Sequence, residues 1–496
     1  MTQVLEQTGM KRELGLLDST MIVAGSMIGS GIFIVTADIA RSVGSPGYIL
    51  LIWLVTGLIT LIAALSYGEL AGMMPKAGGQ YIYLREAYNP LVGFLFGWTV
   101  FMVIQTGVIA AVAIAFAKFT GVLFPDIISS QIVLADLGIF QFNTQQLLAI
   151  ALIAFLTYVN LQGVKNAMII QTTFTLAKIV SLLGLIVLGV YFGLNSEALS
   201  ANLTDFWKPF STIKNADGSI TTEALSGIVL WGAIGAAMVG SLFSSDAWNN
   251  ITYTAGEVKD PQRNIPLSLF FGTLIVTLLY VLANVAYLML LPVMGTPGGE
   301  DVFSRGIMFA TDDRVGTAAI ATIFGSAAVI IMAILIMIST FGCNNGLILS
   351  GARLYYAMAK DGVFFQKAGT LNKNDVPGFA LIIQGIWASL LCLSGTYGDL
   401  LDYCTFSSLL FYVVTIIGLF ILRKTRPDVE RPYKAFGYPV LPAMYIILAG
   451  AICVTLLIYK PTTCGRGLLI VLIGVPVYFL WKRFGNKGPH PINGSN

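Results

Sequence analysis

Charged residues are scarce in this sequence. They make up only 11% of its 496 residues, whereas soluble globular domains carry about 25%. Hydrophobic residues account for 56%, and the mean hydropathy is +0.82. These proportions exclude an ordinary soluble domain and predict a polytopic membrane protein within a lipid bilayer. The formal net charge is only +3, and the basic residues are spread through the loops, so nucleic acid is excluded as a partner.

Histidine and cysteine are also scarce. The single histidine, His490, lies in the polar C-terminal tail, so intramembrane histidine chemistry is excluded. The five cysteines show no metal-type spacing and fall mostly within apolar runs, as small buried side chains do. The sequence also lacks a paired-acid motif and a nucleophile with its base. We therefore expect no enzyme activity, no metal site and no cofactor.

Long apolar runs are what the sequence has in abundance. A membrane-spanning helix needs about 20 apolar residues, and about twelve runs reach that length. They lie near residues 18–42, 47–73, 88–120, 145–163, 167–193, 225–255, 266–292, 317–359, 378–396, 399–423, 437–460 and 464–482. The predicted fold class is an all-α polytopic membrane protein, with its longest polar loops all on one side of the membrane.

The distribution of basic residues predicts how these spans are oriented. With the N-terminus inside, 19 Lys and Arg residues fall on the inner side and 8 on the outer side, while Lys178 lies within the membrane. Because cytoplasmic loops carry an excess of Lys and Arg, both termini are expected to be cytoplasmic. The polar residues 1–16 form an N-terminal tail without the features of a removed signal peptide.

The first apolar run is interrupted at its middle by Gly25–Phe33, of sequence GSMIGSGIF. Glycine costs about 1 kcal/mol against alanine in a helix, so three glycines weaken helical geometry there. One interpretation is a close helix contact through the small residues Gly25 and Gly29. The other is a break that frees backbone groups at mid-membrane to hold a ligand.

A similar segment, Gly240–Ser245 (GSLFSS), interrupts the sixth run. The second segment lies five spans further along the chain, so it enters the membrane from the opposite side. Paired broken helices in corresponding positions of inverted halves indicate a transporter binding site. Chance similarity between two short segments rich in Gly and Ser is the alternative.

The chemistry of the first break fits an α-amino acid. A half-helix that begins after the break would present the amides of Ser30 and Gly31, which favour a carboxylate. The carbonyls around Ser26 and Met27 end the preceding half-helix and favour a cation. Donors and acceptors a few ångströms apart match a zwitterion with adjacent carboxylate and ammonium groups.

The sixth run repeats this arrangement around Phe243–Asn249, which includes Ser244. Asp246 is a carboxylate at membrane depth and hence a candidate functional group. Its structural alternative is a helix cap that accepts hydrogen bonds from the amides near Trp248 and Asn249. Phe243 is either a packing aromatic or a lid over the substrate.

Two further charged residues lie within spans. Lys178, in the fifth span, is too far from either end to snorkel easily, and burying its ammonium costs at least a few kcal/mol unless it is paired. It could replace a bound sodium ion and tie the fifth span to the first and eighth, titrate with protons during transport, or act as a static strut. Glu69, near the inner end of the second span, is expected to partner an inner-loop arginine or cap backbone amides.

Several motifs in order carry a family resemblance. The sequence resembles the L-type amino acid transporter branch of the amino acid–polyamine–organocation superfamily over nearly its whole length. The motifs are Ser26–Phe33, Gly44–Gly47 (GSPG), Tyr67–Leu70 (YGEL), Lys76–Tyr81 (KAGGQY), Gly256–Pro266 (GEVKDPQRNIP), Ser350–Gly362 (SGARLYYAMAKDG) and Arg431–Lys434 (RPYK).

The resemblance implies a LeuT-like fold and sodium-independent amino acid transport, often by obligatory exchange. Two inverted five-helix repeats would occupy residues 17–193 and 225–424. Two further helices would follow within residues 436–484, and residues 485–496 would form a cytoplasmic tail.

The resemblance also assigns roles to residues. The substrate carboxylate would bind the amides of Ser30 and Gly31, and the ammonium would bind the carbonyls of Met27, Phe243 and Asp246. Phe243 would also be the proximal gate. The full predicted set is Ser26, Met27, Gly29, Ser30, Gly31, Phe243, Ser244 and Asp246 for substrate, Lys178 as the ion-site substitute, and Tyr280 and Asn249 as further candidates.

Two departures from the family pattern refine the prediction. Animal members usually have glycine where this chain has Asp246, and they carry a cysteine after the third span that bridges to a single-span glycoprotein. Residues 121–144 contain no cysteine, so a disulfide-linked heavy subunit is not expected. The sequence thus predicts a prokaryotic cell-membrane exchanger of neutral L-amino acids that works by alternating access. Proton-coupled symport of amino acids or amines, and an amino acid sensor that does not transport, are the alternatives.

Overall fold

The computed structural model describes residues 10–136, 141–214, 220–393 and 397–484. Within these ranges ten helices are long and apolar enough to cross a membrane. They are α3 (Pro46–Met73), the continuous α5–η2–α6 (Pro90–Leu123), α7 (Thr144–Leu161), α8 (Val164–Gly193), α10 (Gly227–Ser244), α12 (Pro261–Leu290), α15 (Ala327–Lys360), α17 (Tyr397–Thr425), α18 (Val440–Tyr459) and α19 (Pro461–Phe484). The all-α polytopic fold is confirmed.

The two remaining spans of the expected twelve are built from shorter helices. The ninth contains α16 (Gly378–Leu391), and the first is divided into α1 (Leu16–Met27), the 3₁₀ turn η1 (Gly31–Phe33) and α2 (Thr36–Val43). The sixth span breaks as well, because α10 ends at Ser244 and is followed only by α11 (Asn250–Tyr253) and the 3₁₀ turn η3 (Ala255–Glu257). Both spans are therefore broken: the first within the predicted Gly25–Phe33, and the sixth only from Ser245, the last residue of the predicted Gly240–Ser245, because α10 continues through Ser244.

The eighth span differs from the sequence prediction of one long helix. It is divided into α14 (Val315–Phe324) and α15, and Gly325 between them has a φ of +57°. This left-handed conformation ends a helix and is easily adopted only by glycine. In the third span, by contrast, α5 (Pro90–Thr99) and α6 (Gln105–Leu123) stay continuous through η2 (Val100–Ile104), a π-helical segment.

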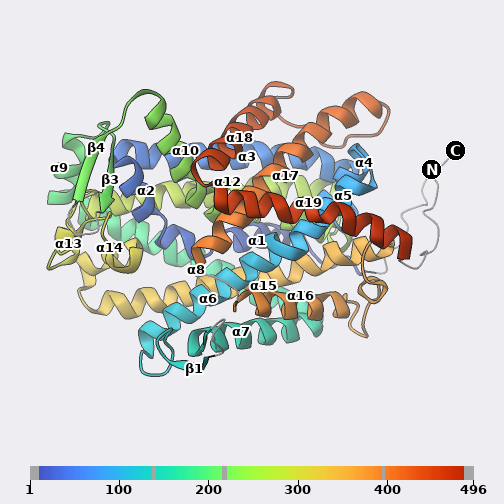
Figure 1. The fold of residues 1–496 in the computed structure, drawn as a ribbon, viewed down its shortest axis with the longest axis horizontal. Coiled ribbons are helices and arrows are strands. Elements are labelled where there is room, and N and C mark those ends of the chain that lie inside the picture. The colour runs from blue at the N-terminus through green and yellow to red at the C-terminus, as the bar shows by residue number, and fades with distance from the viewer. Residues whose placement is uncertain (1–9, 137–140, 215–219, 394–396, 485–496) are drawn as a thin grey trace.

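The connections gather at the two ends of the helix bundle (Figure 1). At one end lie α9 (Glu197–Thr204), the antiparallel hairpin β3 (Phe210–Lys214) and β4 (Ile220–Ala224), and α13 (Val302–Arg305), while α4 (Gln80–Ala87) lies at the other. A second antiparallel pair, β1 (Val133–Asp136) and β2 (Gln141–Asn143), leads into α7. The remaining short turns are η4 (Thr311–Asp313) and η5 (Gln366–Gly369).

The broken first span lies against long helices on several sides. α1 packs on α12, α8 and α15, and α12 in turn packs along α3. Close approach depends on small residues: a Cβ placed on Gly272 of α12 would lie 2.4 Å from Val23 Cγ1 of α1. Small residues at such contacts let helix backbones approach closely. The breaks are thus surrounded by rigid helices rather than by lipid.

Two buried acidic residues tie helices together at the end of the bundle where α4 lies. Glu257 accepts hydrogen bonds from Arg353 Nε at 3.1 Å and Nη2 at 3.0 Å, and both side chains are 1% exposed. Glu69 of α3 accepts from Arg423 of α17 and from the Ala435 amide. The predicted partnering of Glu69 by arginine and backbone amide is confirmed.

The pair of Glu257 and Arg353 predicts a stability effect. Arg353→Met would leave a buried, unpaired carboxylate, which costs about 3–5 kcal/mol. We expect a markedly lower apparent unfolding temperature of the detergent-solubilised protein, followed by size-exclusion chromatography after heating. The double variant Arg353→Met/Glu257→Gln should recover much of the loss, and equal unfolding temperatures of the wild type and Arg353→Met would contradict this account of the pair.

Candidate functional site

The two helix breaks touch each other. A Cβ placed on Gly31 would lie 2.0 Å from Ser244 Oγ and 2.8 Å from Ser244 Cβ, so only glycine fits at this contact. The hydroxyl of Tyr280, on α12, lies 3.1 Å from the Met27 carbonyl oxygen and 3.0 Å from that of Ser244. Tyr280 therefore joins the two breaks, donating its single hydrogen to one carbonyl at a time.

Lys178 holds the end of α1. Its ammonium donates to the carbonyl oxygens of Gly25 at 2.6 Å, Ile28 at 2.7 Å and Ser339 at 3.4 Å, and the residue is 1% exposed. The first two carbonyls lie at the C-terminal end of α1, where the helix dipole favours a positive charge. The ammonium thus connects α8 with α1 and α15, the fifth span with the first and eighth.

Other side chains of α8 and α15 hold the same half-helix. Ser339 Oγ donates to Gly29 O at 2.9 Å, and Cys343 Sγ lies 3.0 Å from Ser26 O. A Cβ placed on Gly25 would lie 2.1 Å from Gln171 Nε2. Gly25 is therefore a close helix contact, as one interpretation of its sequence predicted, while the break begins just after it.

All eight predicted substrate-binding residues line one cavity. Val108, Val112, Ala247 and Cys343 complete its wall. The predicted residues are Ser26, Met27, Gly29, Ser30, Gly31, Phe243, Ser244 and Asp246. The cavity has a volume of about 20 Å³, and a single water needs about 10–15 Å³. The cavity therefore has to widen before an amino acid can enter.

The wall of this cavity offers both kinds of hydrogen-bonding group. In a helix that starts at Gly31, the amides of Gly31 and Ile32 precede the first intrahelical bond, which runs from Phe33 N to Ser30 O. The hydroxyl of Ser26 is buried, and it has no hydrogen-bond partner among the described residues. A buried polar group without a partner is costly, so the site is suited to a polar ligand.

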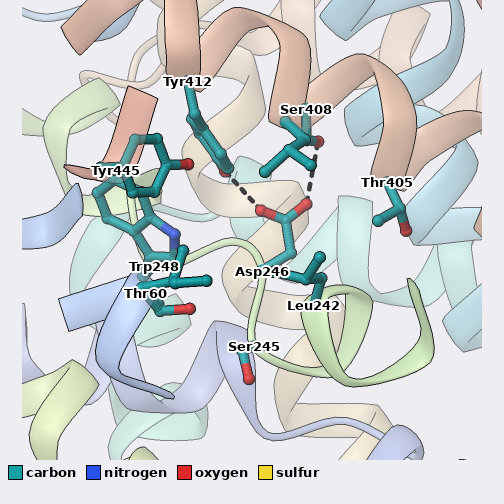
Figure 2. Close-up of a pocket in the computed structure, with 11 residues that line it drawn as sticks. Thr60, Leu242, Ser245, Asp246, Trp248, Thr405, Ser408, Tyr412 and Tyr445 are labelled. Carbon is teal, nitrogen blue, oxygen red and sulfur yellow. Dashed lines mark hydrogen bonds between the residues drawn. The ribbon is translucent and has the colours of Figure 1, made fainter. Parts of the chain in front are cut away.

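The helix-cap interpretation of Asp246 is wrong, because its carboxyl group binds side chains of α17 rather than the amides near Trp248 and Asn249. Its Oδ1 lies 2.5 Å from the Tyr412 hydroxyl, and its Oδ2 accepts from Ser408 Oγ at 3.0 Å (Figure 2). Both partners belong to α17. Ala247, the next residue, has a φ of +65°, so the backbone leaves helical geometry directly after Asp246.

The two further candidates lie outside the wall of the cavity. Tyr280 acts from behind the breaks, and Asn249 lines a neighbouring cavity together with Asp246 and Tyr412. Asn249 Nδ2 donates to Gln80 Oε1 at 2.8 Å and to Tyr253 Oη at 3.0 Å. Its contacts are thus with other polar side chains rather than with the space between the breaks.

Sequence reasoning missed the walls that other helices provide. Val108 and Val112, four residues apart on one face of α6, line the cavity, but nothing distinguishes them within a uniformly apolar run. Ser408 and Tyr412 show the same four-residue spacing on α17. That spacing of two polar side chains within a span is a signal that could have been read.

A cavity between two broken helices is typical of one class of protein, membrane transporters. The family model described as amino acid permease matches residues 14–479. The chain belongs to this family, and it is an amino acid transporter rather than an enzyme.

Named relatives cover almost the whole chain. The chain is similar to the large neutral amino acids transporter small subunit 2 of Homo sapiens, with 31% identity over 96% of this chain and 82% of the relative. It is similar to the b(0,+)-type amino acid transporter 1 of Mus musculus, with 30% identity over 97% and 90%. It is also similar to the Asc-type amino acid transporter 1 of Mus musculus, with 28% identity over 96% and 82%.

The contact between the breaks gives a prediction with an internal control. Gly31→Ala should push the two breaks apart and lower amino acid binding about five- to thirtyfold, the effect of losing one or two hydrogen bonds of about 1 kcal/mol each. Binding is measured by ligand-dependent thermal stabilisation of the purified protein. Gly29→Ala is the control, because its Cβ would meet only Cys343 Sγ, at 3.6 Å.

A smaller residue opposite should restore the contact. The double variant Gly31→Ala/Ser244→Gly removes the side chain that the new methyl group meets, so it should regain part of the binding. Equal losses in Gly29→Ala and Gly31→Ala would show that the contact with Ser244 is not what makes Gly31 necessary.

Proposed function

We propose that this chain exchanges neutral L-amino acids across the cell membrane without sodium, by alternating access. The observation that carries the proposal is the single cavity lined by all eight predicted residues. It lies where one half-helix ends and another begins, and residues from both of these ends line it. This pairing suits the ammonium and carboxylate of an amino acid better than a ligand with one charge.

The substrate would bind mainly to backbone. Its carboxylate would accept from the amides at the start of η1, Ser30 and Gly31, and its ammonium would donate to the carbonyls of Met27, Phe243 and Asp246. The side chain would lie against Val108 and Val112, which are apolar. Apolar walls support neutral substrates, as do the words "large neutral amino acids" in the name of one relative.

Lys178 supports independence from sodium. Its ammonium lies against carbonyl oxygens of α1 and α15, and carbonyl groups of this kind can coordinate a sodium ion in transporters with broken helices. A covalently attached cation removes the need for a free one. The position of α1 would then depend on the Lys178 side chain, and exchange of one amino acid for another would not require a sodium gradient.

The same proposal covers topology and partners. Residues 17–193 and 225–424 would form two inverted repeats, both termini would be cytoplasmic, and the membrane would be the cell membrane of a prokaryote. All five cysteines are buried. The name of one relative contains the words "small subunit". We propose that this chain works without a disulfide-linked partner subunit.

Exchange is tested with purified protein in liposomes. We expect uptake of labelled neutral amino acids into preloaded liposomes to exceed uptake into empty ones by about tenfold or more, because return of the empty carrier would require the unfilled site to cross the barrier. Replacing sodium by potassium should leave the rate unchanged. Equal uptake into empty and preloaded liposomes would rule out obligatory exchange.

The role of Lys178 has its own test. Lys178→Ala removes hydrogen bonds to a charged group, worth about 1.5–3 kcal/mol. If they position α1 for binding, the apparent substrate affinity should fall about ten- to hundredfold. Lys165→Ala is the matched control, since Lys165 lies on the same helix with its side chain 79% exposed. Unchanged affinity and exchange rate in Lys178→Ala would reduce Lys178 to a structural strut.

A further inference from the structure

A chain of buried polar side chains leads away from Asp246. It runs through Tyr412 and Asn249 to Gln80, at the start of α4, and ends at Thr415 of α17. Tyr412, Asn249, Gln80 and Thr415 are buried, and Asp246 is half-buried. The proposed amino acid exchange does not use this series of side chains beyond Asp246. Because each side chain has a fixed number of hydrogens to donate, the donor and acceptor of each bond can be assigned in turn from one end of the series.

The direction of each hydrogen bond can be assigned from Thr415, whose single hydrogen is already used. Thr415 Oγ1 donates its one hydrogen to the Phe411 carbonyl at 2.7 Å, so toward Gln80 Nε2, 3.0 Å away, it is the acceptor. Gln80 Oε1 therefore faces Asn249 and accepts from its Nδ2 at 2.8 Å. The amide of Asn249 is oriented by this bond, which leaves its Oδ1 facing Tyr412.

The assignment ends at the carboxyl group. Tyr412 Oη lies 3.1 Å from Asn249 Oδ1 and 2.5 Å from Asp246 Oδ1, but it has only one hydrogen. If that hydrogen goes to Asn249, the contact with Asp246 needs a hydrogen from the carboxyl group itself. With an ionised carboxylate, Tyr412 would donate to Asp246, and Asn249 Oδ1 would face an oxygen without a hydrogen.

The surroundings of Asp246 contain no charge to balance an anion. Asp246 lines three cavities: the amino acid cavity, the cavity drawn in Figure 2, and the one it shares with Asn249. No Lys, Arg or His among the described residues lines any of them. The titratable groups facing it are neutral hydroxyls and thiols: Tyr412 and Cys404 of α17, Tyr253 of α11, Tyr445 of α18, Tyr67 of α3 behind Tyr412, and Cys343 of α15 across the amino acid cavity.

We propose that Asp246 is a proton-binding site beside the amino acid cavity, protonated in the closed state that the structure represents. The proton completes the hydrogen-bonded chain and removes an ionised carboxylate from membrane depth, where it is costly. If the amide groups of Gln80 and Asn249 flip and the hydroxyls of Thr415 and Tyr412 rotate, every bond in the series runs in the opposite direction, and Tyr412 donates to an ionised Asp246. Loading and release of one proton therefore correspond to two orientations of one network.

Infrared spectroscopy of the protein in nanodiscs tests the proton directly, without any substrate. The wild type should show the carbonyl stretch of a protonated carboxyl group, which Asp246→Asn should lack and alkaline pH should remove. Asp205→Asn, which alters an exposed carboxylate (67%), should leave the band in place. Absence of a band that depends on Asp246 at every pH would overturn the proposal.

Transport supplies the second measurement, and this part rests on the proposed function. Counterflow of a neutral amino acid by the wild type should fall about tenfold per pH unit once the carboxyl group loses its proton. Asp246→Asn, whose amide can donate to Tyr412 as the protonated acid does but cannot ionise, should lose this fall with pH, whatever its absolute rate. Tyr412→Phe should shift the pH profile of the wild type without abolishing it.

The outcomes separate the two proposals. The same pH profile in the wild type and Asp246→Asn would overturn the proton site. A second outcome would also overturn it: if the wild type catalyses counterflow of lysine or arginine, and Asp246→Asn loses that activity without any change in pH profile, then the carboxylate binds the cation of the substrate. Failure of the wild type to catalyse counterflow of any amino acid would instead overturn the proposed function, and the infrared result would still stand.

Discussion

The ammonium of Lys178 at the end of α1 is the contact on which the site depends. A half-helix that stops in the middle of a membrane leaves carbonyl groups without internal partners, and neither lipid nor a neighbouring apolar helix can satisfy them. Lys178 reaches two of these carbonyls and a third on α15. The charge and the break stabilise each other, because each would be costly in the membrane alone.

Around that contact, the two breaks are held by different means on their two sides. α8 and α15 hold the first break through side chains bonded to its carbonyls, while Tyr280 reaches both breaks from α12. The second break has fewer such restraints, and Asp246 ties it to α17 through two hydroxyl groups. The hydrogen bonds between these hydroxyls and Asp246 change when its carboxyl group gains or loses a proton. The partners of Lys178 are backbone carbonyl groups, which do not titrate.

At the end of the bundle that holds α4, two buried glutamates form ion pairs with arginines. Glu257, in the turn that follows the second break, is paired with Arg353 near the end of α15. Glu69 of α3 is paired with arginines at and beyond the end of α17. Such an ion pair stabilises the closed conformation, and its charges can be hydrated when water enters. It is therefore suited to a surface that has to open.

Much of the molecule followed from the sequence. The spans could be read because an apolar run of sufficient length has few alternatives to a membrane helix. The breaks could be read because glycine and serine at Gly25–Phe33 and Gly240–Ser245 weaken helices locally, and Lys178 could be read because a lone ammonium in a span demands partners. Sequence did not indicate that α14 and α15 separate at Gly325, because an isolated glycine is tolerated in many helices.

What the sequence determined by itself was which backbone segments leave the helix and which charges enter the membrane. Only the tertiary structure decided what meets at those places. It places Gly31 against Ser244, Val108 and Val112 in the cavity wall, and the carboxyl group of Asp246 against Ser408 and Tyr412 rather than on the next helix. The physical reason is that local composition controls whether a helix can continue. The partner of a polar group at a helix break depends instead on residues more than a hundred positions away in the sequence.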